Sequence, residues 1–212
     1  MNRAPVSSDY IGMQRDTQRI LDEYLVVLSR TGSQTAFDEL ARRWMPRVLR
    51  YAARTLGAGR DSTEQVRDVV QETWLGVVRG LRGLEDPAQF PAWIYAITTR
   101  KCVDAIRTAA RQRRLGARLE ADGGTDGGAG NDKPERHVDL ESAIARLPED
   151  QRKVVHLYYG EDLGIAEIAA ACDIPAGTVK SRLHHAREAL KRHFQSNSTM
   201  SQIGRTRHER HR

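Results

Sequence analysis

A helical spacing of apolar residues runs through both halves of this 212-residue chain and is interrupted once, near the middle. Apolar side chains recur every three or four positions, as on one face of a helix, over 16–29, 33–56, 62–81, 87–114 and 138–194. The sequence shows no alternating strand patterns joined by hairpin turns. It therefore predicts an all-α fold.

The first two helices are marked by apolar stripes and by end signals. Over 16–29 the stripe consists of Ile20, Tyr24, Val27 and Leu28. Over 33–56 it consists of Phe37, Leu40, Trp44, Val48, Tyr51, Ala52 and Leu56. Gly57 is suited to end the second helix. Asp61 or Ser62 is suited to begin the third, because a short polar side chain can accept a hydrogen bond from a free amide.

The interruption is rich in glycine and aspartate. Residues 119–139 carry six acidic and two basic side chains and contain five closely spaced glycines. Such a composition buries too little apolar surface to offset the entropy lost on ordering. We expect a flexible acidic linker at 115–137 between two small helical domains at 16–114 and 138–194, with a flexible N-terminus at 1–15 and a disordered basic tail at 195–212.

Charge and composition narrow the possible partners, cofactors and cellular location of the protein. There are 34 Lys and Arg against 28 Asp and Glu, a formal charge of +6, which favours a polyanionic partner. No apolar run is long enough to span a membrane, and the N-terminus lacks the apolar segment of an export signal. Cys102 and Cys172 form no CxxC or zinc-type cluster. We expect a cytoplasmic protein with no metal and no cofactor.

The helix expected over 62–81 has two contrasting sides. One side collects an apolar stripe that we assign to the core: Val66, Val69, Val70, Trp74, Val77 and Leu81. The other side carries Asp68, Gln71, Glu72, Leu75, Arg79 and Arg82. A solvated face would explain the charges. However, an apolar residue ringed by charges is also typical of a protein interface, so the position of Leu75 leaves both interpretations open.

The stretch over 87–114 combines aromatic and basic residues. Phe90, Trp93 and Tyr95 precede the segment 100–118, which has seven basic residues and one acidic residue. Aromatic rings can stack on unpaired bases while Lys and Arg follow phosphates. For the rings alone, a place in the core is the simpler interpretation. The basic cluster favours nucleic acid, because like charges so close together repel unless a polyanion neutralises them.

The C-terminal half predicts a helix-turn-helix preceded by two short helices. We expect helices over 138–147 and 148–158, with Pro148 at the first helical position, then 165–171 and 175–194. On the last helix, Val179, Leu183, Ala186 and Leu190 face inward. Its polar side would suit the major groove of DNA and consists of Thr178, Lys180, Ser181, Arg182, His184, His185, Arg187 and Glu188. The alternative is an ordinary helical hairpin with a solvated face.

Three segments in this order resemble the extracytoplasmic-function branch of the sigma-70 family of bacterial RNA polymerase sigma factors. They are DVVQETWLGVVRGL, then DPAQFPAWIYAI, and, after the linker, GTVKSRLHHARE. The first two are similar to sigma domain 2 and the third to sigma domain 4. The resemblance covers about 16–194, which is nearly all of the chain outside its two ends.

The resemblance implies a role for each surface. The partner would be core RNA polymerase, through its β′ clamp helices and its β subunit. The residues that bind it would be Asp68, Gln71, Glu72, Trp74, Leu75 and Arg79. Contacts to the -10 promoter element would fall to Trp93, Tyr95, Arg100, Lys101 and Arg107. Recognition of the -35 element would fall to Thr178, Lys180, Ser181, Arg182, His184, His185 and Arg187. The resemblance also implies a nucleoid-associated protein held in check by an anti-sigma factor.

Three positions depart from the family pattern. Arg100 stands where Asn is frequent, which bears on the preferred -10 base. Gly164 stands where Ser or Thr often caps the first helix of the helix-turn-helix, so we expect a weaker cap. Asp173 stands where the turn often has Gly, and Asp tolerates a left-handed backbone better than most residues. None of these changes is expected to disturb the fold.

Two other kinds of protein remain to be weighed against a sigma factor. A plain transcription regulator would use the same helix-turn-helix but would have no use for a polymerase-binding surface. A nucleic-acid-processing enzyme would need clustered carboxylates, whereas Asp61, Asp68 and Glu72 are scattered around their helix. The sequence has no glycine-rich phosphate loop and no nucleophile elbow. We therefore expect a non-enzymatic specificity subunit.

Overall fold

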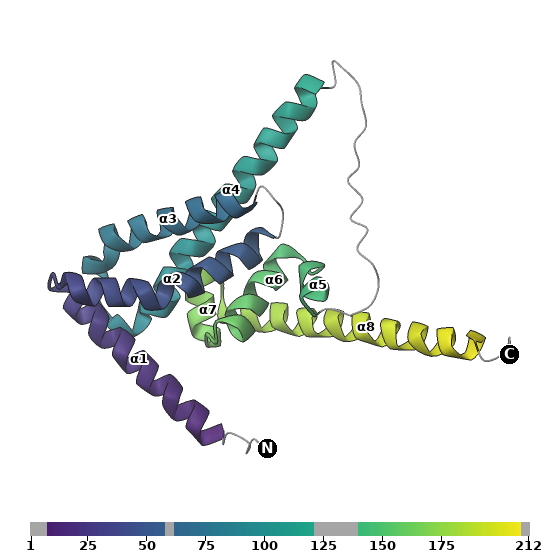
Figure 1. Cartoon of the computed structure of the whole chain (residues 1–212), viewed down its shortest axis with the longest axis horizontal. Helices are drawn as coiled ribbons and strands as arrows, with labels where there is room; N and C mark the ends of the chain where they lie inside the picture. Colours follow the sequence, from purple (N-terminus) through teal and green to yellow (C-terminus); the bar gives the residue numbers. More distant parts are fainter. Residues whose placement is uncertain (1–7, 58–61, 121–139, 209–212) are drawn as a thin grey trace. The chain divides into compact units, whose positions relative to one another are not determined.

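The computed structural model describes residues 8–57, 62–120 and 140–208, and every regular element in these ranges is helical (Figure 1). Side chains are described over 16–57, 63–115 and 140–195. The chain divides into two compact units. The predicted all-α fold is confirmed for this part of the chain. No helix in it is both long enough and apolar enough to cross a membrane.

The N-terminal helices pack in chain order. α1 (Ser8–Arg30) packs on α2 (Gln34–Leu56), and α2 packs on α3 (Ser62–Gly80), so that α2 lies between the other two (Figure 1). Two short 3-10 turns follow, η1 (Leu81–Gly83) and η2 (Pro87–Gln89). η2 packs against α1 and leads directly into the long helix α4 (Phe90–Glu120).

An aromatic cluster joins α2 to α4. The Trp44 ring lies 5.2 Å from Phe90 and 5.9 Å from Tyr95, and the Tyr51 ring lies 5.2 Å from Tyr95, between ring centroids. All four side chains are at most 1% exposed. The Tyr51 hydroxyl shares a buried 2.8 Å hydrogen bond with the Thr99 hydroxyl of α4. Burial raises the pKa of Tyr51 far above its ordinary value, so the phenol stays protonated at neutral pH.

The ends of α2 follow the sequence signals. The Ser33 hydroxyl accepts a hydrogen bond from the Ala36 amide at 3.3 Å. Gly57 has a φ of 87°, and its amide donates to the Ala53 carbonyl. A positive φ suits glycine because it has no Cβ. The predicted helix over 33–56 is therefore confirmed to within one residue.

The helix α1 presents a different face to the core than its apolar stripe indicates. Ile20, Tyr24 and Val27 are 65%, 59% and 44% exposed. Leu25 and Val26, which lie outside the predicted stripe, are buried instead, together with Asp22, whose carboxylate accepts a 2.8 Å hydrogen bond from Arg43 Nε of α2. Rotating α1 to bury the stripe would expose Leu25 and Val26 and would separate Asp22 from Arg43. The burial of these two apolar residues and the ion pair together account for the orientation of α1.

The C-terminal helices are shorter than those of the N-terminal half, except for the last one. They are α5 (Leu140–Ala145), α6 (Glu149–Val155), a π-helical turn η3 (His156–Gly160), α7 (Ile165–Cys172) and α8 (Ala176–His208). α8 packs against α6 and, more lightly, against α5. The side chains buried in these helices and their connections include Val154, Leu157, Leu163, Ile168, Val179, Leu183 and Ala186.

Several expected boundaries shift. Pro148 caps α6 from outside rather than occupying its first turn, and the expected helix over 148–158 ends at Val155, where η3 takes over. α4 continues to Glu120, six residues into the expected linker, and α8 continues to His208 through much of the expected tail. Neither extension contains proline, the residue that most strongly breaks a helix. Residues 121–139 lie outside the described residues.

A close contact fixes the start of α4 against the end of α3. A Cβ added at Gly80 would lie 2.8 Å from Cζ2 of Trp93. The Trp93 ring is itself held by Phe90, with the two centroids 6.1 Å apart. Only glycine therefore fits at position 80 without displacing this indole ring.

Tyr51→Phe tests the buried hydrogen bond between α2 and α4. We expect the free energy of unfolding to fall by about 1 kcal/mol, because Thr99 loses its partner inside the core. Urea unfolding at pH 7, followed by circular dichroism, measures the change. Tyr24→Phe, which removes the same hydroxyl from an exposed ring, is the matched control and should change stability by less than about 0.5 kcal/mol. Equal effects would contradict the assignment.

Gly80→Ala tests the contact with Trp93. We expect a loss of about 1–3 kcal/mol, because the added methyl group must displace a packed ring. Gly83→Ala is the control, since a Cβ there meets nothing within 4 Å. Urea unfolding gives both values, and tryptophan fluorescence reports whether the indole moves. A Gly80→Ala protein as stable as the wild type would show that the ring yields freely.

Candidate protein and nucleic-acid interfaces

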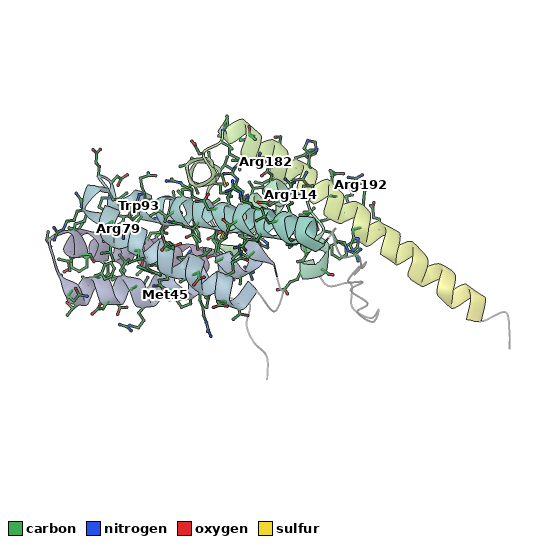
Figure 2. The ribbon with its side chains drawn as sticks, turned by 90° about the horizontal axis from the view of Figure 1, so that it is seen from above. Met45, Arg79, Trp93, Arg114, Arg182 and Arg192 are labelled. Carbon is green, nitrogen blue, oxygen red and sulfur yellow. The ribbon has the colours of Figure 1, made fainter. Side chains whose placement is uncertain are left out.

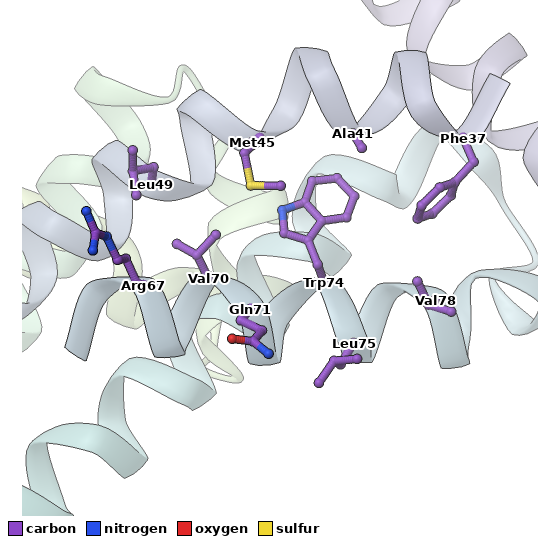
Figure 3. Close-up of a pocket in the computed structure, with 10 residues that line it drawn as sticks. All are labelled: Phe37, Ala41, Met45, Leu49, Arg67, Val70, Gln71, Trp74, Leu75 and Val78. Atoms are coloured by element: carbon purple, nitrogen blue, oxygen red, sulfur yellow. The ribbon is translucent and has the colours of Figure 1, made fainter. Parts of the chain in front are cut away.

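An apolar groove runs between α2 and α3, with a volume of about 550 Å³ (Figure 3). α2 contributes one wall, spaced every four residues: Phe37, Ala41, Met45 and Leu49. α3 contributes the other: Arg67, Val70, Gln71, Trp74, Leu75 and Val78. Four of its apolar side chains are 38–59% exposed, namely Met45, Leu49, Leu75 and Val78. Contiguous exposed apolar surface of this kind marks a binding site.

Trp74 forms the centre of the groove (Figure 3). Its ring stands edge to face with Phe37, with centroids 6.1 Å apart and planes at 88°. The residue is only 8% exposed, and its indole N–H has no hydrogen-bond partner among the described residues. A buried donor without an acceptor is costly. Because this nitrogen is itself covered, the groove offers the Trp74 ring rather than its N–H to an incoming chain.

Leu75 stands at the edge of the groove. The predicted polymerase-binding set divides there: Gln71, Trp74 and Leu75 line the groove, whereas the charged members do not. At 100° per residue, these charged members fall beyond Leu75, toward α4, and all are exposed: Asp68, Glu72 and Arg79. The six apolar residues assigned to the core side of the predicted helix over 62–81 are all buried, as predicted, and the last of them, Leu81, belongs to η1. Leu75 is thus part of a larger apolar surface.

The rest of the groove is not predicted by the apolar stripes of the sequence. The α2 stripe places Phe37 in the core only. A signal was present, because Phe37, Ala41, Met45 and Leu49 recur at intervals of four, directly beside the core positions Leu40, Trp44 and Val48. Two adjacent apolar stripes on one helix indicate two packing surfaces. Only the three-dimensional arrangement shows that the second has no cover within the described chain.

An arginine stripe lies along α4. Arg100, Arg107, Arg111 and Arg114 are all exposed and fall within about 60° of one another on the helix. They extend over about 21 Å, at 1.5 Å per residue. Figure 2 shows Trp93 near the beginning of α4 and Arg114 near the end of its basic stretch. Such a row of guanidinium groups is suited to following the phosphates of a nucleic-acid strand.

Lys101 lies beside this stripe and is paired within the molecule. Its Nζ is 3.0 Å from Glu72 Oε2 of α3, and the two side chains are 37% and 52% exposed. An exposed pair of this kind contributes little stability and exchanges partners readily. It connects the predicted polymerase-binding set with the predicted -10 set. Either a phosphate or a protein cation can therefore compete for one member of the pair.

The aromatic members of the predicted -10 set are structural. Tyr95 is fully buried, between Trp44 and Tyr51, so its assignment as a DNA contact is wrong for this conformation. Trp93 is half-buried and is held by Phe90 and Gly80. The predicted core interpretation of the aromatic residues is the one that the structure supports. Arg100 and Arg107 remain at the surface.

The helix-turn-helix is built as its sequence predicts. Asp173 adopts a φ of 54° in the turn between α7 and α8, the left-handed conformation expected of it. The Ile174 amide donates to the Ala169 carbonyl at 3.0 Å and closes the turn. At the start of α7 the Gly164 amide donates to Glu167 Oε2 at 2.6 Å. This carboxylate thus supplies a cap from within the helix, where Gly164 has no side chain to provide one.

The polar side of α8 divides into two groups. Lys180, Ser181, His184 and His185 are exposed, whereas Val179, Leu183 and Ala186 are buried as predicted. Two of the predicted DNA contacts instead touch the helices of their own domain. Arg182 Nη2 lies 2.8 Å from Asp150 Oδ2, and Arg187 Nε donates to the Tyr159 hydroxyl at 2.8 Å. Thr178 is half-buried at the start of the helix.

Within the ranges that the structure describes, no group of three or more His, Cys, Asp or Glu side chains is placed to hold a metal ion. The adjacent His184 and His185 rings face each other edge to face at 5.6 Å. The arrangement instead offers an apolar groove, an arginine stripe and a polar helix face. These three surfaces are suited, in that order, to docking of a protein, binding of a single nucleic-acid strand and contacts in the major groove of DNA.

Comparisons with known proteins match both halves of the chain. Residues 40–112 match the family model of Sigma-70 region 2, and residues 137–190 match that of Sigma-70, region 4. The ECF RNA polymerase sigma factor SigE of Mycolicibacterium smegmatis is 32% identical over 183 residues, covering 82% of this chain and 68% of that protein. The ECF RNA polymerase sigma-E factor of Escherichia coli K12 is 31% identical over 187 residues, covering 82% and 94%.

Solved structures agree with these sequence matches. The structure of CnrH in complex with the cytosolic domain of CnrY matches with a TM-score of 0.58 and 26% identity, over 83% of this chain and 98% of CnrH. The sigma factor RpoE of Bartonella quintana, in complex with the anti-sigma factor NepR, shares the fold with a TM-score of 0.55 at 22% identity, over 75% and 96%. The chain therefore belongs to the extracytoplasmic-function branch of the sigma-70 family, the RNA polymerase sigma factors that direct transcription initiation at specific promoters.

Proposed function

We propose that this sigma factor docks on core RNA polymerase through the groove between α2 and α3. The observation that carries the proposal is the exposed apolar surface around Trp74 and Leu75, bordered by charged side chains. An apolar centre with a charged rim is typical of a protein interface. A helix of the β′ clamp would lie along the groove and pack against the Trp74 ring and Leu75. Asp68, Glu72 and Arg79 would then meet charges at its edge.

The proposal assigns the -10 element to the arginine stripe of α4. Arg100 and Arg107, from the predicted set, would follow the phosphates of the separated non-template strand, and Arg111 and Arg114 would extend that path. Lys101 would join them on release from Glu72. Stacking on an unpaired base would have to come from a ring at the surface. Among the predicted aromatic contacts, only the half-buried Trp93 could offer part of its edge.

The -35 element is assigned to the exposed face of α8. Lys180, Ser181, His184 and His185 point away from the domain and can donate hydrogen bonds to base edges or phosphates in the major groove. Thr178 would contact the backbone at the entry of the helix. The turn fixed by Asp173 determines how far this helix projects.

Melting of promoter DNA requires no catalytic group under this proposal. Opening the duplex costs base stacking and pairing, and binding of the separated strand along α4 offsets that cost. The chain then acts as a specificity subunit rather than an enzyme. Its place of action is the cytoplasm, in association with the polymerase on the nucleoid.

A regulatory partner is also proposed. The solved RpoE structure holds an anti-sigma factor, NepR, and the CnrH structure holds the cytosolic domain of CnrY. An anti-sigma factor of this chain would block transcription most directly by covering the groove around Trp74. Occupied in this way, the groove could not receive the polymerase.

Leu75→Asp tests the groove as the docking site for core RNA polymerase. We expect the dissociation constant to rise at least about tenfold, because a buried leucine contributes about 1.5–3 kcal/mol and a buried unpaired carboxylate adds a further cost. Leu75 is 38% exposed in the free chain, so the fold should be retained. Fluorescence anisotropy of labelled chain titrated with core polymerase gives the affinity, and circular dichroism verifies helicity.

Leu115→Asp provides the matched control for this measurement. It places the same carboxylate on an exposed leucine of α4, away from the groove lining. Its affinity for core should remain within about twofold of the wild type. If Leu75→Asp binds core as tightly as Leu115→Asp, the groove is not the docking site. If the wild-type chain does not bind core but still binds DNA, the plain-regulator alternative takes over.

A further inference from the structure

Two arginines border the buried stripe of α8, one on each side. Val179, Leu183 and Ala186 form the stripe, and at 100° per residue Arg182 and Arg187 fall on opposite flanks of it. Both side chains reach elements that precede α8 in its own domain. They differ in this from the exposed residues on the opposite side of the helix.

Arg182 holds one flank of α8 to the first turn of α6. Its Nη2 lies 2.8 Å from Asp150 Oδ2, and its side chain is 27% exposed. Asp150 stands in the acidic first turn of α6, with 61% of its side chain exposed. Charged hydrogen bonds from a guanidinium depend strongly on geometry. The pair therefore specifies an orientation of α8 relative to α6 even if it adds little stability.

Arg187 holds the other flank to the π-helical turn after α6. Its Nε donates to the Tyr159 hydroxyl at 2.8 Å. Its guanidinium carbon lies 5.8 Å from the Tyr158 ring centroid and 5.7 Å from that of Tyr159, within the range of a cation–π contact. The two tyrosine rings stand edge to face at 4.8 Å. Arg187 and Tyr159 are both exposed, so these directional contacts, rather than burial, hold the guanidinium in place.

Two attachments on opposite flanks resist rotation of the helix about its own axis. A helix with side chains is about 10–12 Å across, so a rotation of about 20° moves a side-chain tip by about 2 Å. That displacement is enough to break a hydrogen bond to a base edge. These directional contacts on both flanks add to the resistance that the buried Val179, Leu183 and Ala186 already provide.

We propose that Arg182 and Arg187 are positioning residues that set the rotation of the recognition helix, rather than contacts to DNA. Promoter reading is then left to Lys180, Ser181, His184 and His185. The inference rests on the proposed -35 role of α8 and refines it. It also adds Asp150, Tyr158 and Tyr159 to the residues on which recognition of the -35 element depends.

The test measures the affinity of the holoenzyme for duplex DNA over a range of salt concentrations. The probe is a duplex that the wild-type chain with core RNA polymerase selects from a randomised DNA pool. Loss of one phosphate contact lowers the slope of log affinity against log salt by about 0.9. We expect Arg182→Ala to weaken binding about tenfold, the loss of about one base contact, with an unchanged slope. Lys180→Ala, the control, should lower the slope.

Two further variants separate positioning from contact. The exchanged pair, Arg182→Asp with Asp150→Arg, should recover most of the lost affinity, because the ion pair is restored in reverse. Arg187→Lys keeps the charge but loses the flat guanidinium and its Nε donor, so we expect it to weaken binding as much as Arg187→Ala does. If Arg187 contacted a phosphate, binding would instead survive Arg187→Lys. If Arg182 contacted a phosphate, the exchanged pair would abolish that contact and would not recover the affinity.

Three results would overturn the inference. One is a lower salt slope in Arg182→Ala that the exchanged pair fails to restore, which would make Arg182 a DNA contact. Another is wild-type affinity in Arg182→Ala with only a lower melting temperature, which would make its role purely structural. Third, a wild-type holoenzyme that selects no duplex would overturn the proposed function itself. That failure is visible before any variant is compared.

Discussion

The contact between α2 and α4 is the interaction on which the N-terminal surfaces depend. Trp44 and Tyr51 of α2 interlock with Phe90 and Tyr95 of α4, and the Tyr51–Thr99 hydrogen bond fixes the register of the two helices. Because one stripe of α2 is committed to this cluster, the adjacent stripe must face elsewhere. It meets α3 only partly, and the groove is what remains open between them. The binding surface is thus a by-product of how the core is packed.

α3 presents two chemically different surfaces, one apolar and one charged, on neighbouring sides of the helix. Toward α2 it presents Trp74 and Leu75 to the groove, and toward α4 it presents Glu72 to Lys101. An exposed ion pair of this kind is weak, so it can be broken without disturbing the fold. Under the proposed assignments, a polymerase cation that engages Glu72 would release Lys101 for a phosphate. Docking and strand binding would then favour each other, although only modestly.

Much of this arrangement could be predicted from the sequence, for identifiable reasons. Local rules of periodicity and backbone conformation predict the six core residues over 62–81, the ends of α2 and the left-handed Asp173. The rotation of α1 could not be predicted, because two sets of apolar residues on this helix compete for the core. Leu25 and Val26 are the buried set, on the side where Asp22 pairs with Arg43 of α2. The burial of Tyr95 and the internal contacts of Arg182 are likewise tertiary. Spacing identifies a surface but cannot show whether a polar residue on it already has a partner.

The two kinds of surface also respond differently to salt. Apolar burial in a groove such as that around Trp74 persists as ionic strength rises, whereas phosphate binding along the Arg100–Arg114 stripe weakens through counterion return. Under the proposed assignments, a sigma factor of this design would stay on its polymerase while its grip on DNA is adjusted. At the -35 element, Asp150 offsets the charge of Arg182, and the contact with Tyr159 directs Arg187 toward its own domain. Under the proposal, recognition is left to the side chains that face the base pairs.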